Sequence, residues 1–239
     1  MPPDASRTRE QLLDAAARAF ADHGVAGASM LDITRRAGQR NRGALHYHFG
    51  SRSGVVGAVL ERHVAFLARR EGELLALAAA SSPDDVASVV EAIVRPAAEL
   101  AASGWRGRCA LVILAELVEE DPADLDAEVR AVLDRTGGPA VYALLAERMA
   151  AVDDAVRIER FALITGFILR SVADRARIEG RRGRRGRPQL DDEAFVGNLV
   201  AMIAAAVSAP WRPPKADQSP SPEEGSSPSG AGTRAGRRL

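Results

Sequence analysis

The sequence predicts an all-α protein. Apolar residues make up 46% of the 239 residues, whereas aromatic residues make up only 4%. Alanine, leucine and arginine are abundant, and these residues favour helices over strands. Apolar side chains recur at helical spacing along most of the chain, and no long stretch alternates apolar and polar residues as a strand does. We therefore expect an N-terminal three-helix unit followed by a helical bundle.

The composition excludes several classes of protein. Cys109 is the single cysteine, which excludes a disulfide framework and a cysteine-based zinc site. His46 and His48 lie two residues apart, which is not a same-face helical spacing, so we expect no metal site and no cofactor. The N-terminus lacks the apolar core of a signal peptide, and the longest apolar stretch, Leu199–Trp211, is too short to span a bilayer. We expect a cytoplasmic protein.

The chain divides into three predicted regions: residues 1–55, residues 56–210 and residues 211–239. Residues 1–52 carry 8 basic and 5 acidic side chains, whereas residues 53–173 carry 12 and 19. This asymmetry indicates that the first region meets an anion and the second does not. Residues 212–239 include five prolines and five serines and almost no core-forming side chain, so we expect a disordered tail.

The first region shows the pattern of three short helices. Gly24 ends the first apolar stripe, Ser29 opens a second helix as the first residue of a capping box, and Gly38 ends it. Asn41 is expected to cap a third helix through about His46. Ser51 is expected to cap a long helix to about Leu77, which we expect to be the only link between the two domains. The core of the unit is predicted to contain Leu12, Leu13, Phe20, Ile33, Leu45 and Phe49.

Two short helices joined by a glycine turn are the pattern of a helix-turn-helix, whose second helix enters the major groove of DNA. Arg42 is predicted to bond guanine, and Asn41 is either a contact to DNA or only a helix cap. Arg52, together with Ser51 and the start of the long helix, is predicted to hold a phosphate. The full set of predicted DNA contacts is Ser29, Gln39, Arg40, Asn41, Arg42, Gly43, Ala44, His46, Tyr47, His48, Ser51 and Arg52.

These residues resemble the DNA-binding domain of the tetracycline-repressor (TetR) family of bacterial regulators. The matching positions are Thr8-Arg9-Glu10, Leu13-Asp14-Ala15-Ala16, Phe20-Ala21, Gly24, Ser29-Met30, Asp32-Ile33, Ala37-Gly38, Gly43-Ala44-Leu45-His46-Tyr47-His48-Phe49 and Ser51-Arg52. The resemblance implies an all-helical homodimer that regulates transcription in response to a ligand, usually as a repressor. It covers about fifty residues, and similarity beyond residue 55 consists mainly of helices at suitable positions.

The chain departs from the family pattern at three places. His46 stands where the family usually has a tyrosine that bonds a phosphate, and a protonated histidine donates a stronger bond. Arg52 replaces the usual lysine, which keeps the charge but changes its geometry. The usual acidic residues after Ser51 are missing, and Gly54 lies in the first turn of the helix, where it costs up to ~1 kcal/mol relative to alanine.

The second region is predicted to hold a small, largely apolar effector between its helices. Polar and aromatic residues set among apolar stripes are the candidates for the pocket, and each has a simpler interpretation as a residue of the core. These candidates are Trp105, Cys109, Glu116, Tyr142, Thr165 and Arg170.

The last two predicted helices, 153–179 and 191–209, are apolar over more than one face, which indicates a subunit interface. The residues predicted to form it are Phe167, Ile168, Val172, Phe195, Leu199 and Ile203. Between these helices lies an arginine-glycine run from Arg181 to Arg187. It is either a basic arm for nucleic acid or a solvated connector.

The leading hypothesis is a ligand-gated regulator whose partners are double-stranded operator DNA, a small effector and a second copy of the chain. Two other functions are the alternatives to it. A constitutive DNA-binding protein has the same helix-turn-helix and no effector. A helical enzyme is the weaker alternative, because the chain has no glycine-rich phosphate loop, no metal-ligand cluster and no nucleophile turn.

Overall fold

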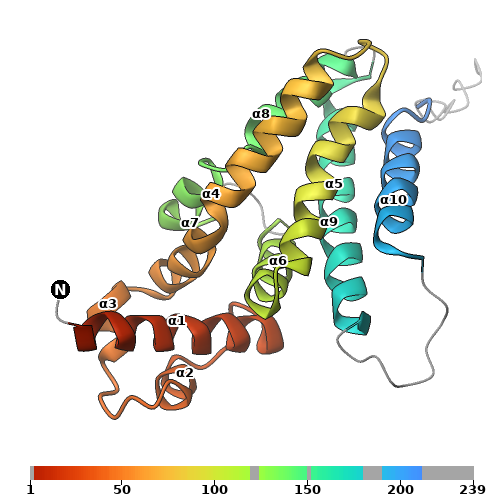
Figure 1. The fold of residues 1–239 in the computed structure, drawn as a ribbon. Coiled ribbons are helices and arrows are strands. Elements are labelled where there is room, and N and C mark those ends of the chain that lie inside the picture. The colour runs from red at the N-terminus through yellow and green to blue at the C-terminus, as the bar shows by residue number, and fades with distance from the viewer. Residues whose placement is uncertain (1–2, 119–123, 150–151, 180–189, 212–239) are drawn as a thin grey trace, which may run out of the picture. The chain divides into compact units, whose positions relative to one another are not determined.

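The computed structural model describes residues 3–118, 124–149, 152–179 and 190–211, and within them the chain forms ten α-helices and no strand. The predicted all-α class is therefore confirmed. The described residues up to Ala209 belong to one compact unit (Figure 1). The helices are α1 (Pro3–His23), α2 (Met30–Arg36), α3 (Ala44–Phe49), α4 (Arg52–Ala79), α5 (Val86–Ala102), α6 (Trp105–Leu117), α7 (Ala127–Leu133), α8 (Gly138–Arg148), α9 (Asp154–Glu179) and α10 (Asp192–Val207).

Helices α1, α2 and α3 share one core, and their ends follow local chemistry. Gly24 ends α1 with a φ of 79°, in the left-handed region that favours glycine. The hydroxyl of Ser29 caps α2 by accepting a hydrogen bond from the Asp32 N–H at 3.2 Å, as the capping box predicts. Leu12, Leu13, Phe20, Ile33 and Leu45 are buried as expected, whereas Phe49 is half-buried.

The turn between α2 and α3 is longer than predicted. Gly38 has a φ of 72° and makes the corner that the sequence indicates. The third helix begins at Ala44, three residues after the expected cap. Asn41 does not cap it; its Oδ1 accepts a hydrogen bond at 2.9 Å from the backbone N–H of Gly43. This bond between a side chain and a nearby backbone group stabilises the turn. It offers the backbone an alternative to helical hydrogen bonding, so the helix starts later.

Helix α4 leads from this unit along the bundle, beside α5 and α8 (Figure 1). The Ser51 hydroxyl caps it by accepting from the Gly54 N–H at 2.8 Å. Its inward face is mostly aliphatic, with Val56, Leu60 and Leu67 buried. The predicted boundary at residue 55 falls inside α4, so one continuous helix crosses from one predicted domain to the next.

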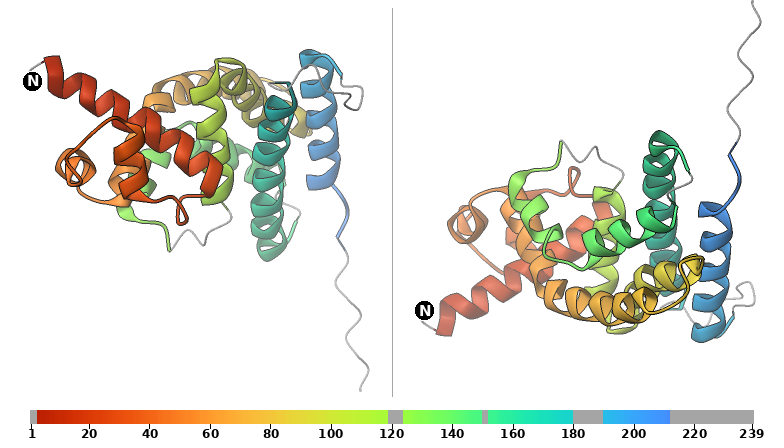
Figure 2. Two further views of the ribbon diagram at one scale, coloured as in Figure 1. Left: turned by 90° about the horizontal axis from the view of Figure 1, so that it is seen from below. Right: turned by 90° about the horizontal axis from the view of Figure 1, so that it is seen from above.

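Helices α5, α6, α8, α9 and α10 complete the bundle. Helix α5 lies against α4 and α10, and α6 lies against α9. Helix α5 continues through Pro96, which is buried. Figure 2 shows α9 and α10 side by side at one end of the unit. Among the described helices, none combines the length and apolarity that crossing a bilayer requires. Residues 181–187 and the tail from residue 212 lie outside the described ranges.

Candidate DNA-binding surface and its contacts

The turn before α3 and the outer face of α3 present a row of polar side chains. Arg40, Asn41, Arg42, His46 and Tyr47 are exposed, and Tyr47 is 83% exposed although it is aromatic. The backbone at Gly43 is exposed as well. These exposed residues lie between Arg40 and Tyr47 and are accessible to DNA, whereas Ala44 and Leu45 between them are buried.

Other predicted contacts serve the fold of this unit. Ala44 was expected at the DNA surface, but its side chain is buried and holds α3 against the core. Gln39 is half-buried, and its amide donates to the backbone oxygen of Ala37 and to Gln11 on α1, each at 3.4 Å. His48 is half-buried and lies edge-on to the Tyr47 ring, with centroids 5.1 Å apart. Its ring thereby supports the exposed tyrosine.

The predicted phosphate clamp is occupied by contacts within the protein. Nη1 of Arg52 donates to the backbone oxygens of Val25 at 2.6 Å and Ala28 at 2.7 Å. Arg52 therefore ties the start of α4 to the loop between α1 and α2. Ser51 caps α4 and donates its hydroxyl hydrogen to Oε2 of Glu128 on α7 at 2.9 Å. A phosphate at this site must compete with that carboxylate or bind through the remaining guanidinium hydrogens.

Helix α6 makes a second connection to the DNA-binding unit. Oε1 of Glu116 accepts a hydrogen bond at 2.8 Å from the backbone N–H of Val25. Arg18 of α1 stacks on the Trp105 ring at 3.8 Å. Arg106 bonds Asp14 of α1 in a bidentate ion pair at 2.8 and 2.5 Å. The expectation that the long helix alone joins the two predicted domains is therefore wrong.

This connection also changes the interpretation of the predicted ligand pocket. Trp105 contacts α1 and Glu116 contacts the loop that follows α1. These contacts account for both side chains without a ligand pocket. Cys109 is half-buried, and burial raises the pKa of its thiol, with Asp22 of α1 acting in the same direction. Arg170 is exposed on α9. Helical spacing places Trp105, Cys109 and Glu116 near the apolar face of α6, but it does not show which neighbouring element they contact.

Tyr142 and Thr165 are the two predicted pocket residues that the structure brings together. Their hydroxyls share a hydrogen bond between α8 and α9, and the Thr165 hydroxyl also donates to the backbone oxygen of Phe161 at 2.6 Å. Burial raises the pKa of Tyr142 to about 12. The hydroxyl therefore stays protonated and links two helices of the bundle.

Sequence reasoning missed Glu71, a buried acid on α4. Its side chain packs against Gly137 at the start of α8, and its Oε2 accepts no hydrogen bond from the described part of the chain. Burial raises the pKa of Glu71 to about 7, although the backbone N–H groups of Gly137 and Gly138 favour the charged form. The signal was available, because Glu71 lies at helical spacing between the apolar residues Leu67 and Leu74.

The predicted dimer residues are mostly part of the core of a single chain. Ile168, Val172, Leu199 and Ile203 are buried without any partner chain. Phe195 is half-buried with the Arg175 guanidinium over its ring at 4.6 Å. Phe167 is the exception, with 48% of its surface exposed. The extra apolar residues of α9 and α10 are explained largely by α5 and α6, against which these helices pack.

An exposed helix-turn-helix on a helical bundle defines a class of DNA-binding proteins. Two models of the same family match the chain. The model described as "Bacterial regulatory proteins, tetR family" matches residues 12–59, and the model of the tetracyclin repressor-like C-terminal domain matches residues 91–206. The chain belongs to the TetR family. This family consists of transcriptional regulators and not of enzymes, which confirms the expectation that the chain is not an enzyme.

Individual relatives match over shorter segments. A probable HTH-type transcriptional regulator, ArpR, from Pseudomonas putida is 38% identical over 77 residues, which are 30% of this chain and 36% of that protein. The HTH-type regulator TtgR from P. putida is 41% identical over 58 residues, 24% of this chain and 27% of that protein. The chain thus spans about a third of the length of these curated relatives. A TetR-like regulator structure from Rhodococcus has a TM-score of 0.49 at 19% identity, covering 85% of this chain and 97% of its own.

Proposed function

We propose that the protein is a cytoplasmic regulator that binds a specific DNA operator and is released from it by a small effector, most simply as a repressor. The exposed side chains between Arg40 and Tyr47 carry this proposal. They include cationic, amide and aromatic groups on and before a short helix at the end of a helix-turn-helix. Arginine and asparagine in the major groove bond guanine and adenine edges.

A homodimer completes the proposal, because a single short helix covers only half of a typical operator. We assign the interface to the outer faces of α9 and α10. Leu163 is 63% exposed, Phe167 48% and Met202 50%. A Cβ atom added to Gly166 or Gly197 would meet open space, so the outer faces of both helices leave room for close packing against a partner. The operator is then a near-palindrome, with half-sites ~34–36 Å apart or wider.

Two connections can carry the response to an effector. Helix α4 reaches the DNA-binding unit directly, and α6 reaches it through Glu116, Trp105 and Arg106. A ligand that moves α6 relative to α4 changes the angle of α1–α3 on the bundle, and the two DNA-binding units of a dimer then no longer match the duplex. A coupling free energy of ~1–3 kcal/mol suffices for such release.

Selection of bound sequences from random duplex DNA tests the proposal. We expect a near-palindromic motif, and effectors found by screening for release should lower the affinity for that motif. Recovery of DNA without any preferred sequence would contradict specific regulation. A motif whose binding responds to no ligand, in a screen that includes both apolar and charged compounds, would favour the constitutive DNA-binding alternative.

A further inference from the structure

A cleft of about 540 Å³ lies among α5, α6, α9 and α10. Its apolar wall includes Ala98 and Ala102 of α5, Val172 and Ala176 of α9, and Phe195 of α10. The alanine side chains are too short to fill the cleft, so the space between the helices stays open. None of the pocket residues predicted from the sequence lines this cleft. Its volume is within the range of small-molecule sites, about 300–1,000 Å³.

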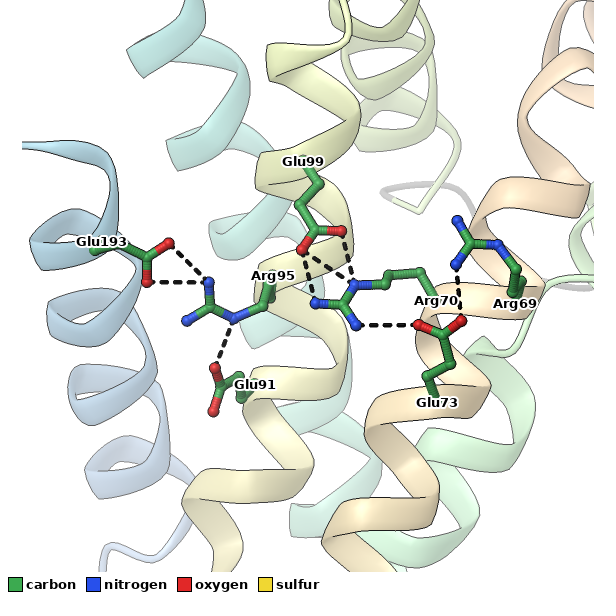
Figure 3. Close-up of polar contacts among 7 residues, drawn as sticks. All are labelled: Arg69, Arg70, Glu73, Glu91, Arg95, Glu99 and Glu193. Atoms are coloured by element: carbon green, nitrogen blue, oxygen red, sulfur yellow. Dashed lines mark hydrogen bonds and ion pairs between the residues drawn. The ribbon is translucent and has the colours of Figure 1, made fainter.

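Most of the charged groups that line the cleft are neutralised by the protein. Arg95 donates to Glu91 at 2.7 Å and to both oxygens of Glu193 at 3.0 and 3.1 Å (Figure 3). Arg175 donates to Asp192 at 2.6 Å and stacks on Phe195. These pairs set the shape of the rim. They leave little net charge there to attract or repel a ligand.

Arg108 is different from the other two arginines. It lines the cleft from α6 and is half-buried, and its guanidinium forms no hydrogen bond or ion pair with any residue in the described ranges. A guanidinium keeps its charge at all physiological pH values and presents five N–H donors in a planar fork. A partly desolvated cation beside an apolar wall binds an anion more strongly than a cation in water does.

We propose that the cleft binds a small amphipathic anion, with a carboxylate or phosphate on Arg108 and an apolar body against Ala98, Ala102 and Phe195. Carboxylate and phosphate groups both match the guanidinium fork. The aromatic ring of Phe195 and the small alanines accommodate a chain or ring rather than a second charged group. The ligand is therefore a singly headed organic acid or ester rather than a dicarboxylate or a cation.

The cleft also has a path to the DNA-binding unit. Glu99 lines it, and both carboxylate oxygens of Glu99 accept from Arg70 of α4, at 2.8 to 3.1 Å (Figure 3). Arg70 also donates to Glu73 at 3.1 Å. Arg108 and Glu99 line the same cleft, so an anion bound to Arg108 would change the electrostatic environment of the Arg70–Glu99 ion pair, which joins α4 to α5. The role of the cleft as an effector site depends on the ligand response proposed above. The binding of an anion in the cleft does not depend on that response.

Calorimetric titration of the full-length protein without DNA tests the proposal. The probes are octanoate and octyl phosphate, with octan-1-ol and octylammonium as neutral and cationic counterparts. We expect at least one anion to bind, and both counterparts to bind at least about tenfold more weakly. The comparison of octanoate with octyl phosphate identifies the preferred head group.

Variants locate the binding. Arg108→Gln should weaken binding of the anion about tenfold or more, Arg108→Lys should retain part of it, and Ala98→Phe should abolish it by filling the cleft. Arg177→Gln on the exposed face of α9 is the matched control and should bind as the parent does. The cooperative thermal unfolding of each variant verifies its fold.

Three results would overturn the proposal: neither anion binds, octan-1-ol binds as tightly as the anions, or Arg108→Gln leaves binding unchanged. The first result is also the one expected if the helices of a second copy fill the cleft. Operator affinity is measured separately with and without the bound anion. Binding without release would leave the site in place and contradict only its role as the effector site.

Discussion

The backbone N–H of Val25 donates a 2.8 Å hydrogen bond to the carboxylate of Glu116, and so joins the loop after α1 to helix α6. The same residue, Val25, offers its backbone oxygen to Arg52 at 2.6 Å. Both polar groups of one loop residue are thus held by side chains from two different helices, α6 and α4. We expect a movement of either helix to reach the helix-turn-helix through this loop.

Substitution of Glu116 by alanine should weaken the link to α6. The charged acceptor is lost and the Val25 N–H is left without its partner, which should lower the free energy of unfolding by about 1–3 kcal/mol. Urea denaturation measures the change. Glu147→Ala, an exposed acid on α8, is the control and should change it by less than about 0.5 kcal/mol. Equal stability of the two variants would show that the Glu116 bond contributes nothing.

Arg52→Ala should reduce stability as well as DNA affinity. Its guanidinium holds two backbone oxygens of the α1–α2 loop, and the loss of these charge-assisted bonds should lower the free energy of unfolding by about 2 kcal/mol. If Arg52 also holds a phosphate, the variant binds all sequences more weakly and its affinity depends less steeply on salt. Denaturation and a salt titration of operator binding separate the two effects. A variant as stable as the parent would contradict the structural role.

The dimer interface is tested by Leu163→Asp combined with Phe167→Asp. Both side chains are exposed on α9, so the charges should disturb a subunit contact without entering the core. Sedimentation velocity should show folded monomers. Leu77→Asp, at an exposed leucine of α4, is the matched control and should remain dimeric. A dimer that survives both α9 substitutions would place the interface elsewhere.

The same experiment distinguishes this interface from the one expected from the sequence. Leu199 is only 3% exposed in a single chain, so Leu199→Asp should unfold the protein rather than dissociate it. Circular dichroism should therefore show loss of helix for Leu199→Asp and retention of helix for the α9 variant. A folded, monomeric Leu199→Asp protein would restore the original assignment.

Glu71 should make the stability fall as the pH rises. Its pKa is raised to about 7 in the folded protein from an ordinary 4.5, so the folded state holds a proton that the unfolded state releases between these values. The loss of stability begins near pH 4.5 and is complete above pH 7. It is on the order of 3 kcal/mol.

The variant Glu71→Gln should remove this loss. It should be more stable than the parent at pH 8, and the difference should shrink toward zero near pH 4.5. Thermal unfolding across that range measures it, with Glu147→Gln at an exposed position as the control. A parent that is more stable than Glu71→Gln at pH 8 would show that Glu71 is stabilised in its charged form.

The fold and the DNA-binding unit were predictable because their signals are local. Gly24, Ser29, Gly38 and Ser51 act on backbone groups a few residues away, and the structure confirms each as the start or end of a helix. Asn41 shows the limit of such reasoning. An asparagine can cap a helix or order a turn, and the choice depends on the path of the following residues.

The contacts of the bundle were not predictable in the same way. Glu116 reaches a residue 91 positions away, and helical spacing contains no information about which helix lies opposite. Leu199 and Phe167 illustrate the same point, because both are apolar positions on the last two helices. Leu199 is covered by its own chain and Phe167 is exposed, and the packing of α9 and α10 on the rest of the bundle decides which side chain is covered.

The most direct test of the central claim is the sequence preference of Arg42→Ala, measured against the selected operator and every single-base variant of it. Arg42 is exposed in the turn before α3, so its removal should leave the fold intact. We predict a loss of ~1–3 kcal/mol on the operator and relaxed preference at one position in each half-site, with little change on unrelated DNA. If Arg42→Ala loses the same affinity for every DNA sequence, Arg42 does not read a base.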